Sequence, residues 1–281
     1  MKIGVDVGGT WLRLGAWDGT AVRGLERLPA VRSARALADA LRGYIERSCP
    51  GGAESVALGI PGTLDRARRT VLNTPNLPLG GVPLADELEQ ELGVPVILDN
   101  DVTMLLRGDI ALLGRGVEGL TVGLYAGTGL GGAVFLDGRP LAGKHGICEP
   151  GHMPVPGRTE RCTCGGTGCA ENYVSGRRLM EIAAELGTGV GSLFTQYAEH
   201  TDVLRFLDDL AAVAAGIAVL LDPDLMILGG GVVCAPGFPR DKFAELIRAK
   251  CMHPVPGDSL DIVFSSEAPE LGVLGAALTE K

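Results

Sequence analysis

The chain has 281 residues, of which 46% are hydrophobic and 4% aromatic, and its 34 acidic and 25 basic residues give a formal net charge of −9. A chain of this length can bury one large core or two ordinary ones. Nucleic acids and anionic membranes bind basic surfaces, so this charge argues against both as partners. Glycine and proline are frequent, with 43 and 17 residues, which predicts a turn-rich globular protein.

The N-terminal segment does not resemble a secretory signal, because Asp6 interrupts the hydrophobic run that begins at Ile3. A longer uncharged run, Gly119–Leu136, is interrupted by glycines and is better explained as strand, turn and strand than as a membrane helix. We therefore expect a cytoplasmic protein. In that compartment the 7 cysteines are expected to be metal ligands or core residues rather than disulfides.

The first part of the chain predicts an α/β fold. Apolar alternation predicts strands over 2–7 and 11–17, joined by a corner at Gly8-Gly9. Helices and strands then alternate: a helix over 33–48, a strand over 55–60, a helix over 84–92, a strand over 94–98 and a helix over 102–113. This order is typical of a mostly parallel sheet with helices packed on it.

After Gly114-Arg115-Gly116 the pattern begins again. Gly4 and Gly8 are four residues apart, as are Gly123 and Gly127, and both pairs lie in a strand that runs into glycines. Two matched glycines are compatible with a duplicated domain and equally with chance. The remaining pattern predicts strands over 120–125 and 133–136, a cysteine-rich loop over 161–169, helices over 170–186 and 210–221, a strand over 225–228, and a final helix from about 271.

Three glycine-rich segments could hold phosphates, because backbone N–H groups reach phosphate oxygens where no Cβ intervenes. They are 6–10, 127–132 and 229–231. The second fits G-x-G-x-x-G, but it precedes a predicted strand rather than a helix, so it is not a dinucleotide fingerprint. Two tight hairpins without a ligand are the alternative. A Gly-Thr turn used twice, with Asp6 able to hold Mg²⁺ beside the first, favours nucleotide binding.

The cysteine-rich loop contains a possible metal site. Cys162, Cys164 and Cys169, with His152, supply three thiolates and an imidazole, which is a complete set for structural zinc. One residue between Cys162 and Cys164 is a tighter spacing than usual, so chance free thiols remain the alternative.

Several polar residues could act in catalysis or binding. Asn100-Asp101 follows a predicted strand, where it could cap the next helix or place Asp101 as a general base in a ligand site. Glu149 and Glu171 could be ordinary solvated or helix-terminal charges, or could bind hydroxyls in a pocket. Asn76 is otherwise a turn residue.

In their order along the chain these motifs resemble the ROK family of sugar kinases and sugar-responsive repressors. The most specific is Cys-x-Cys-Gly-x-x-Gly-Cys-x-Glu over 162–171, and the resemblance covers nearly the whole chain. It implies an actin-like ATPase (ribonuclease H-like) α/β fold with two duplicated domains and an interdomain cleft. The expected domains are 1–113 with 271–281, and 114–270.

The resemblance also implies a role for each motif. Asp101 would accept the proton of an attacking 6-hydroxyl, and zinc would be structural on His152, Cys162, Cys164 and Cys169. Mg²⁺ would accompany ATP at Asp6. The phosphates of ATP would lie on Gly8, Gly9, Thr10, Gly127, Thr128 and Gly129, with adenosine near Gly229 and Gly230. The sugar would contact Asn76, Asn100, Asp101, Glu149, His152 and Glu171. The partners implied are a hexose and ATP, in a homodimer.

Within this resemblance four short stretches, 74–79, 143–146, 221–232 and 238–240, favour D-allose as the hexose. Glucose and N-acetylmannosamine are alternative hexoses, and polyphosphate is an alternative donor. Trp11 and Leu79 replace a Lys and a Trp of many relatives, and Cys148 and Pro150 replace commoner residues around Glu149. A repressor of the family would carry a DNA-binding module before the first glycine loop, and we expect none because Asp6 is the sixth residue.

Overall fold

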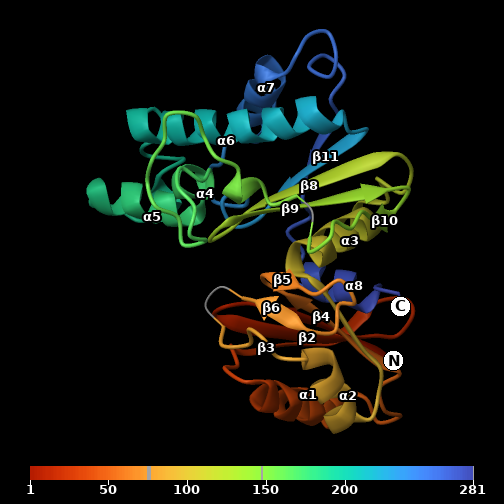
Figure 1. The fold of residues 1–281 in the computed structure, drawn as a ribbon. Coiled ribbons are helices and arrows are strands. Elements are labelled where there is room, and N and C mark those ends of the chain that lie inside the picture. Colours follow the sequence, from red (N-terminus) through yellow and green to blue (C-terminus); the bar gives the residue numbers. More distant parts are fainter. Residues whose placement is uncertain (75–76, 147, 281) are drawn as a thin grey trace. The chain divides into compact units, whose positions relative to one another are not determined.

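The computed structural model describes residues 1–74, 77–146 and 148–280. It divides into two compact units, shown in Figure 1. The first unit contains residues 1–115, 142–147 and 268–281, and the second contains residues 116–141 and 148–267. The expected domain limits and the cleft between the domains stay predictions.

The first unit is built on a five-stranded sheet in the order β3-β2-β1-β4-β7. Strands β1, β2 and β3 pair antiparallel, whereas β1, β4 and β7 run parallel. The strands are β1 (Lys2–Val7), β2 (Trp11–Trp17), β3 (Val22–Pro29), β4 (Ser55–Ile60) and β7 (Val96–Asn100); a separate small hairpin is formed by β5 (Thr63–Leu64) and β6 (Val71–Asn73).

Helices cover both faces of this sheet (Figure 1). The larger hydrophobic core includes apolar residues of α1 (Ala34–Ser48) and α2 (Leu84–Leu92) together with residues of the strands. On the other face α3 (Asp101–Leu113) and α8 (Leu271–Ala277) pack on β4 and β1. The C-terminal helix therefore belongs to the first unit, and it supports the helix that Asp101 begins.

Two glycines bring α3 and α8 unusually close. A Cβ at Gly275 would lie 1.7 Å from the carbonyl oxygen of Met104, and one at Gly108 would lie 2.4 Å from that of Leu271. Backbone therefore packs on backbone, and neither position can hold a larger residue without moving a helix.

The second unit repeats the plan of the first. Its sheet has the order β10-β9-β8-β11-β12, in which β8, β9 and β10 pair antiparallel and β8, β11 and β12 run parallel. This match of order and direction confirms the duplicated α/β fold. The strands are β8 (Leu120–Ala126), β9 (Leu130–Leu136), β10 (Arg139–Pro140), β11 (Leu225–Gly229) and β12 (Ile262–Phe264).

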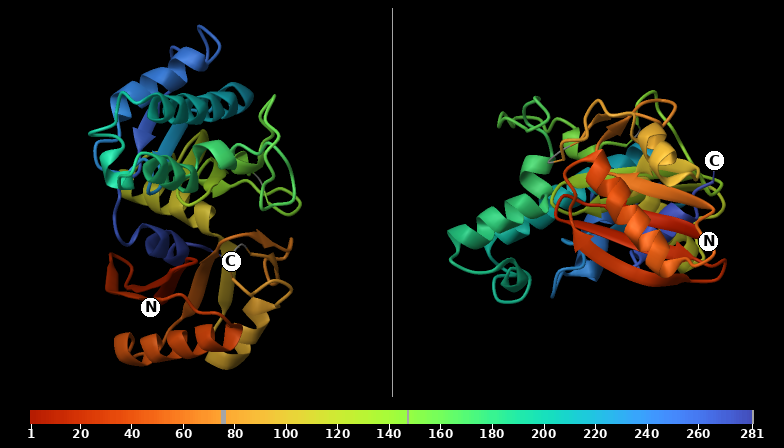
Figure 2. Two further views of the ribbon diagram at one scale, coloured as in Figure 1. Left: turned by 90° about the vertical axis from the view of Figure 1, so that its left-hand side faces the viewer. Right: turned by 90° about the horizontal axis from the view of Figure 1, so that it is seen from below.

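One hydrophobic core joins this second sheet to its helices. Figure 2 shows the same sheet and helices from two further directions. The helices are α4 (Glu171–Val174), α5 (Gly176–Glu185), α6 (Thr201–Leu221) and α7 (Arg240–Lys250), with short 3₁₀ turns η1 (Pro150–His152) and η2 (Val190–Ser192). Among the described residues, no helix combines the length and apolar character needed to cross a bilayer.

Some predicted boundaries were wrong. The strand predicted over 94–98 runs from Val96 to Asn100, because Pro95 has no N–H for the ladder. The helix predicted over 170–186 is interrupted at Ser175, which is extended, and the one predicted over 210–221 begins at Thr201. The strand predicted to end at Tyr125 ends at Ala126, and the strand predicted to begin at Ala133 begins at Leu130.

Candidate active site and zinc loop

The first glycine loop is the turn of the β1–β2 hairpin. The Gly8 N–H donates to the carbonyl of Trp11 at 2.9 Å, and a Cβ at Gly8 would lie 2.9 Å from that oxygen. The hairpin register places Asp6 opposite Arg13, whose Nη1 donates to Asp6 Oδ2 at 2.9 Å. Burial raises the pKa of Asp6 and the Arg13 guanidinium opposes that shift. A bound cation would favour the ionised form of the same carboxylate.

Asn100 and Asp101 lie where β7 ends and α3 begins. Asn100 caps the helix, since its Oδ1 accepts from the Val102 N–H at 3.0 Å, and its Nδ2 donates to the Gly62 carbonyl at 3.1 Å. Asp101 is half-buried and its Oδ1 accepts from the same N–H at 2.9 Å. The capping role is thus filled by Asn100, and the Asp101 carboxylate lies at the carboxyl end of a parallel strand, where ligands of α/β sheets bind.

The second glycine loop joins β8 to β9 in a tight turn, with the Gly127 N–H donating to the Gly129 carbonyl at 2.9 Å. It precedes a strand, as the sequence predicted, so the dinucleotide explanation is excluded. Glu171 holds the far side of the turn, because its Oε2 accepts from the Leu130 N–H at 3.2 Å. A Cβ at Gly129 would lie 2.3 Å from that oxygen.

The glycines of the segments 127–132 and 229–231 differ in whether packing requires them. A Cβ at Gly229 would lie 2.7 Å from the Tyr125 ring, and Gly230 has φ of +89° with a Cβ position 2.4 Å from the Ala126 carbonyl. These two are fixed by packing. At Gly127 and Gly231, in contrast, a Cβ would meet nothing within 4 Å and φ is not positive. Packing does not require glycine at these two positions, and the absence of a Cβ would let a phosphate or a nucleotide approach the backbone there.

Glu149, His152 and Glu171 are brought together in the second unit. η1 follows Glu149, whose carbonyl accepts from the His152 N–H at 3.0 Å. Burial raises the pKa of Glu149, with Glu171 adding to the shift and His152 opposing it. Glu171 is 15% exposed and pairs with Arg177 at 3.2 Å. Two carboxylates and an imidazole therefore share one polar region, a composition suited to hydroxyl groups.

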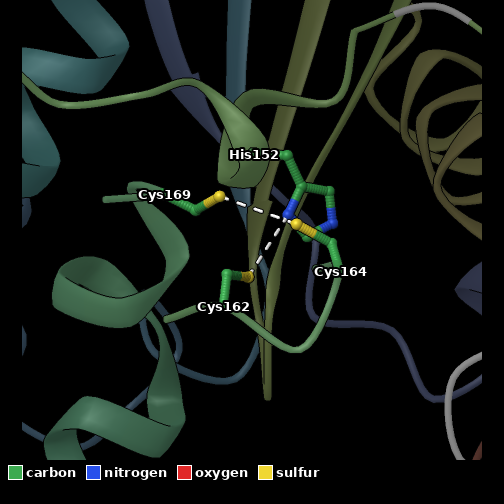
Figure 3. Close-up of side chains that lie close together, drawn as sticks. All are labelled: His152, Cys162, Cys164 and Cys169. Carbon is green, nitrogen blue, oxygen red and sulfur yellow. Dashed lines mark hydrogen bonds between the residues drawn. The ribbon is translucent and has the colours of Figure 1, made fainter. Parts of the chain in front are cut away.

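The four predicted metal ligands converge, as Figure 3 shows. Their ligand atoms all lie within 4.8 Å of one another, with His152 Nδ1 3.8 Å from Cys162 Sγ and Cys164 Sγ 3.6 Å from Cys169 Sγ. A tetrahedron with metal–sulfur bonds of 2.3 Å has edges of about 3.8 Å. The donor set and its spacing therefore fit zinc, with Nδ1 as the histidine ligand.

The predicted residues thus form two groups, each described within its own unit. The first unit contains Asp6, Gly8, Gly9, Thr10, Asn100 and Asp101. The second unit contains Gly127, Thr128, Gly129, Glu149, His152, Glu171, Gly229, Gly230 and the cysteine ligands Cys162, Cys164 and Cys169. Asn76 lies outside the described residues. Their functional roles stay predictions.

Several residues near these groups were not predicted from the sequence. Arg13 could have been found, because a tight hairpin around Gly9-Thr10 places it opposite Asp6. Arg27 stacks on Trp11 with 3.6 Å between guanidinium carbon and ring centroid, and so places a cation beside the first loop. Ser175 interrupts the helix so that the next N–H, of Gly176, donates to the Gly127 carbonyl at 2.7 Å; no local pattern marks it.

The sequence model of the ROK family matches residues 2–281. The chain belongs to the ROK family. An N-acetyl-D-glucosamine kinase of Escherichia coli O6:H1 is 34% identical to it over 275 residues, covering 88% of this chain and 89% of that protein. The ROK hexokinase of Thermus thermophilus is 30% identical, with a TM-score of 0.80 over 98% of this chain and 96% of that one.

A structure of a ROK glucokinase from Streptomyces griseus, in complex with glucose and AMPPNP, also has a TM-score of 0.80 to this chain. The identity is 27%, and the match covers 98% of this chain and 97% of that one. Kinase relatives and the duplicated sheets together give the chain the actin-like ATPase fold.

Proposed function

We propose that this ROK protein transfers the γ-phosphoryl group of ATP to the 6-hydroxyl of a hexose. The observation that carries the proposal is Asp101 at the start of α3, directly after β7, with its neighbour Asn100 filling the capping role. A carboxylate at the carboxyl end of a parallel strand, where ligands of α/β sheets bind, can accept the hydroxyl proton during transfer.

ATP would be held mainly by backbone. A Cβ at Gly127 or Gly231 would meet nothing within 4 Å, so the backbone at both positions is open to a phosphate, and the loop at Gly8–Thr10 is a second turn between two strands. Mg²⁺, bound with ATP, would neutralise charge on the phosphates, and Asp6 is the carboxylate suited to hold it or its waters. Backbone dipoles and one metal ion can thus bind a polyanion in a protein with a net charge of −9.

The sugar would be bound by Asn76, Asn100 and Asp101 with Glu149, His152 and Glu171. Zinc on His152 Nδ1 would leave Nε2 facing outward as a fixed donor to a hydroxyl, since a ligated imidazole keeps one tautomer. Zinc is then structural, and it holds the loop that carries His152 beside Glu171.

We propose N-acetyl-D-glucosamine as the first candidate sugar, supported by kinases for that sugar that are 34% identical to this chain. D-allose is the second candidate, supported by the four short stretches named above. One changed hydroxyl or an added acetamide is distinguished by buried hydrogen bonds, which can give large differences in kcat/KM.

A coupled ADP-release assay with ATP and a panel of hexoses tests the proposal. The panel contains N-acetyl-D-glucosamine, D-allose, D-glucose and N-acetyl-D-mannosamine, with inorganic polyphosphate as a second donor. We expect one sugar to be favoured in kcat/KM and its product to be the 6-phosphate by NMR. No ADP release with any hexose, from folded protein that contains zinc, would contradict it.

A further inference from the structure

A cavity of about 560 Å³ lies on the second unit, and none of the residues assigned to ATP or the sugar is among its lining residues. Its walls are the segment 158–163, α4, α5 and the first turns of α6. Figure 1 shows the three helices close together. A cavity of this size holds a small organic ligand.

Arginine is the prominent residue of this cavity. Five of its lining residues are arginines, and we refer to them as the arginine pocket: Arg158, Arg161, Arg177, Arg178 and Arg205. Four carboxylates also line it, and most of the charges are paired. Arg158 pairs with Asp209, Arg178 with Glu181, and Glu160 accepts a hydrogen bond from Tyr173.

Two of these guanidinium groups make no direct hydrogen bond to a described residue, although the charge of Arg205 acts on Asp209 and opposes the burial that raises the pKa of that carboxyl. Within the part of the chain that the structure describes, the side chains of Arg161 and Arg205 make no hydrogen bond or ion pair. The backbone of Arg161 is held in place, because Asn172 Nδ2 donates to its carbonyl at 3.2 Å. The two positive charges of Arg161 and Arg205 in one cavity match the two charges of a phosphate monoester, whose oxygens accept bidentate hydrogen bonds from arginine.

The arginine pocket has a direct connection to the candidate sugar site. Arg177 lines the cavity and pairs with Glu171, which in turn accepts from the N–H of Leu130 in the second glycine loop. An anion that draws Arg177 towards the cavity would weaken its hold on Glu171.

We propose that the arginine pocket binds a sugar phosphate, and that the bound anion lowers the affinity of the enzyme for its sugar substrate. The second half rests on the proposed function, whose product is a hexose 6-phosphate. The pocket would then make the product a feedback inhibitor that acts from a separate site.

Binding is tested first, by isothermal titration calorimetry of the zinc-containing protein with D-glucose 6-phosphate, inorganic phosphate and neutral D-glucose. The variants are Arg161→Gln with Arg205→Gln, and Arg205→Gln alone should the double variant fold poorly. Arg139→Gln, an exposed arginine of the same unit, is the matched control. We expect glucose 6-phosphate to bind wild type and the control alike, and the double variant at least tenfold more weakly. Equal binding by all three, no binding, or equal affinity for inorganic phosphate would overturn the assignment.

Regulation is tested second, by measuring the KM for the favoured sugar with and without glucose 6-phosphate. We expect KM to rise at least threefold in wild type and to stay unchanged in the double variant. A rise of the same size in both would overturn the coupling. The calorimetry does not require turnover, so the arginine pocket can be established or rejected even if the protein transfers no phosphoryl group.

Discussion

Packing requires glycine at some positions of the candidate site and not at others. Gly229 and Gly230 have packing reasons to be glycine, whereas Gly127 and Gly231 have none within 4 Å. Gly127 and Gly231 lie in two of the glycine-rich segments predicted to hold phosphates, so an approaching ligand would account for glycine at both positions. Asn100 and Asp101 both accept from the Val102 N–H of α3, and Asn100 also donates to the Gly62 carbonyl.

Gly127→Ala and Gly229→Ala are therefore expected to differ. A methyl group at Gly127 meets open space and should leave the free energy of unfolding within about 0.5 kcal/mol of wild type. It should raise the KM for ATP, because the Cβ occupies the phosphate approach. The methyl group at Gly229 meets the Tyr125 ring and should cost about 1–3 kcal/mol.

Urea denaturation and initial rates measure the two effects. Unchanged ATP kinetics in a stable Gly127→Ala protein would remove this glycine from the nucleotide site.

The thiols of the cysteine-rich loop over 161–169 should make the proposed zinc binding depend on pH. Burial, with hydrogen bonds from the Cys169 thiol to Cys164 and Cys162, raises the pKa of Cys169 to about 12 in the metal-free loop. The free thiol therefore keeps its proton at neutral pH, and zinc must displace that proton to bind. Affinity should fall as pH falls, by about tenfold per pH unit for each proton displaced.

Competition with a chromogenic chelator between pH 8 and pH 5.5 measures the slope. We expect one zinc per chain at the high end and progressive release below it. Zinc content independent of pH, or absent from protein purified without chelator, would contradict the Cys₃His site.

At the scale of elements, helix packing fixes where Asp101 lies. α3 begins at Asp101, and its position depends on close contact with α8, which comes from the far end of the chain. Gly59 of β4 contributes from the sheet, since a Cβ there would lie 3.2 Å from the Asp101 Cα. Asp101, the proposed general base, is therefore positioned by backbone contacts of three separate elements.

Gly275→Ala tests this contact. Its Cβ would lie 1.7 Å from the Met104 carbonyl, so α8 must move, at a cost of about 3 kcal/mol or more. Gly216→Ala is the matched control, because Gly216 is an exposed helical glycine of α6 with nothing within 4 Å of its Cβ position. It should stabilise the protein by roughly 0.5–1 kcal/mol.

Thermal denaturation of both variants provides the comparison. Equal melting temperatures would show that α3 and α8 are not held as closely as described.

Sequence reasoning worked where a pattern is local. The hairpin around Gly8-Gly9, the capped helix from Ser33 and the ligand spacing of the cysteine loop follow from neighbouring residues, and all are present. The break at Ser175 was missed because its cause is distant: the Gly176 N–H is drawn to the Gly127 carbonyl. Arg177 was missed for a similar reason, as an ordinary helical arginine until α4 places Glu171 against it.

At the scale of the whole molecule, duplication explains why two glycine turns occur in one chain. Both sheets have the same order, and in each the turn follows the first strand of its repeat, β1 or β8. Each unit supplies one group of the residues assigned to ATP and the sugar. The homodimer stays a prediction, and light scattering at several protein concentrations would test it.

Asp101 is proposed as the general base of an ATP-dependent hexose kinase. Its most direct test is kcat for Asp101→Asn with the favoured sugar, alongside sugar binding by calorimetry and Asp39→Asn as an exposed control. We expect kcat to fall by about 10³-fold or more, sugar affinity to stay within about tenfold, and the control to match wild type. A kcat for Asp101→Asn close to that of wild type would contradict the account.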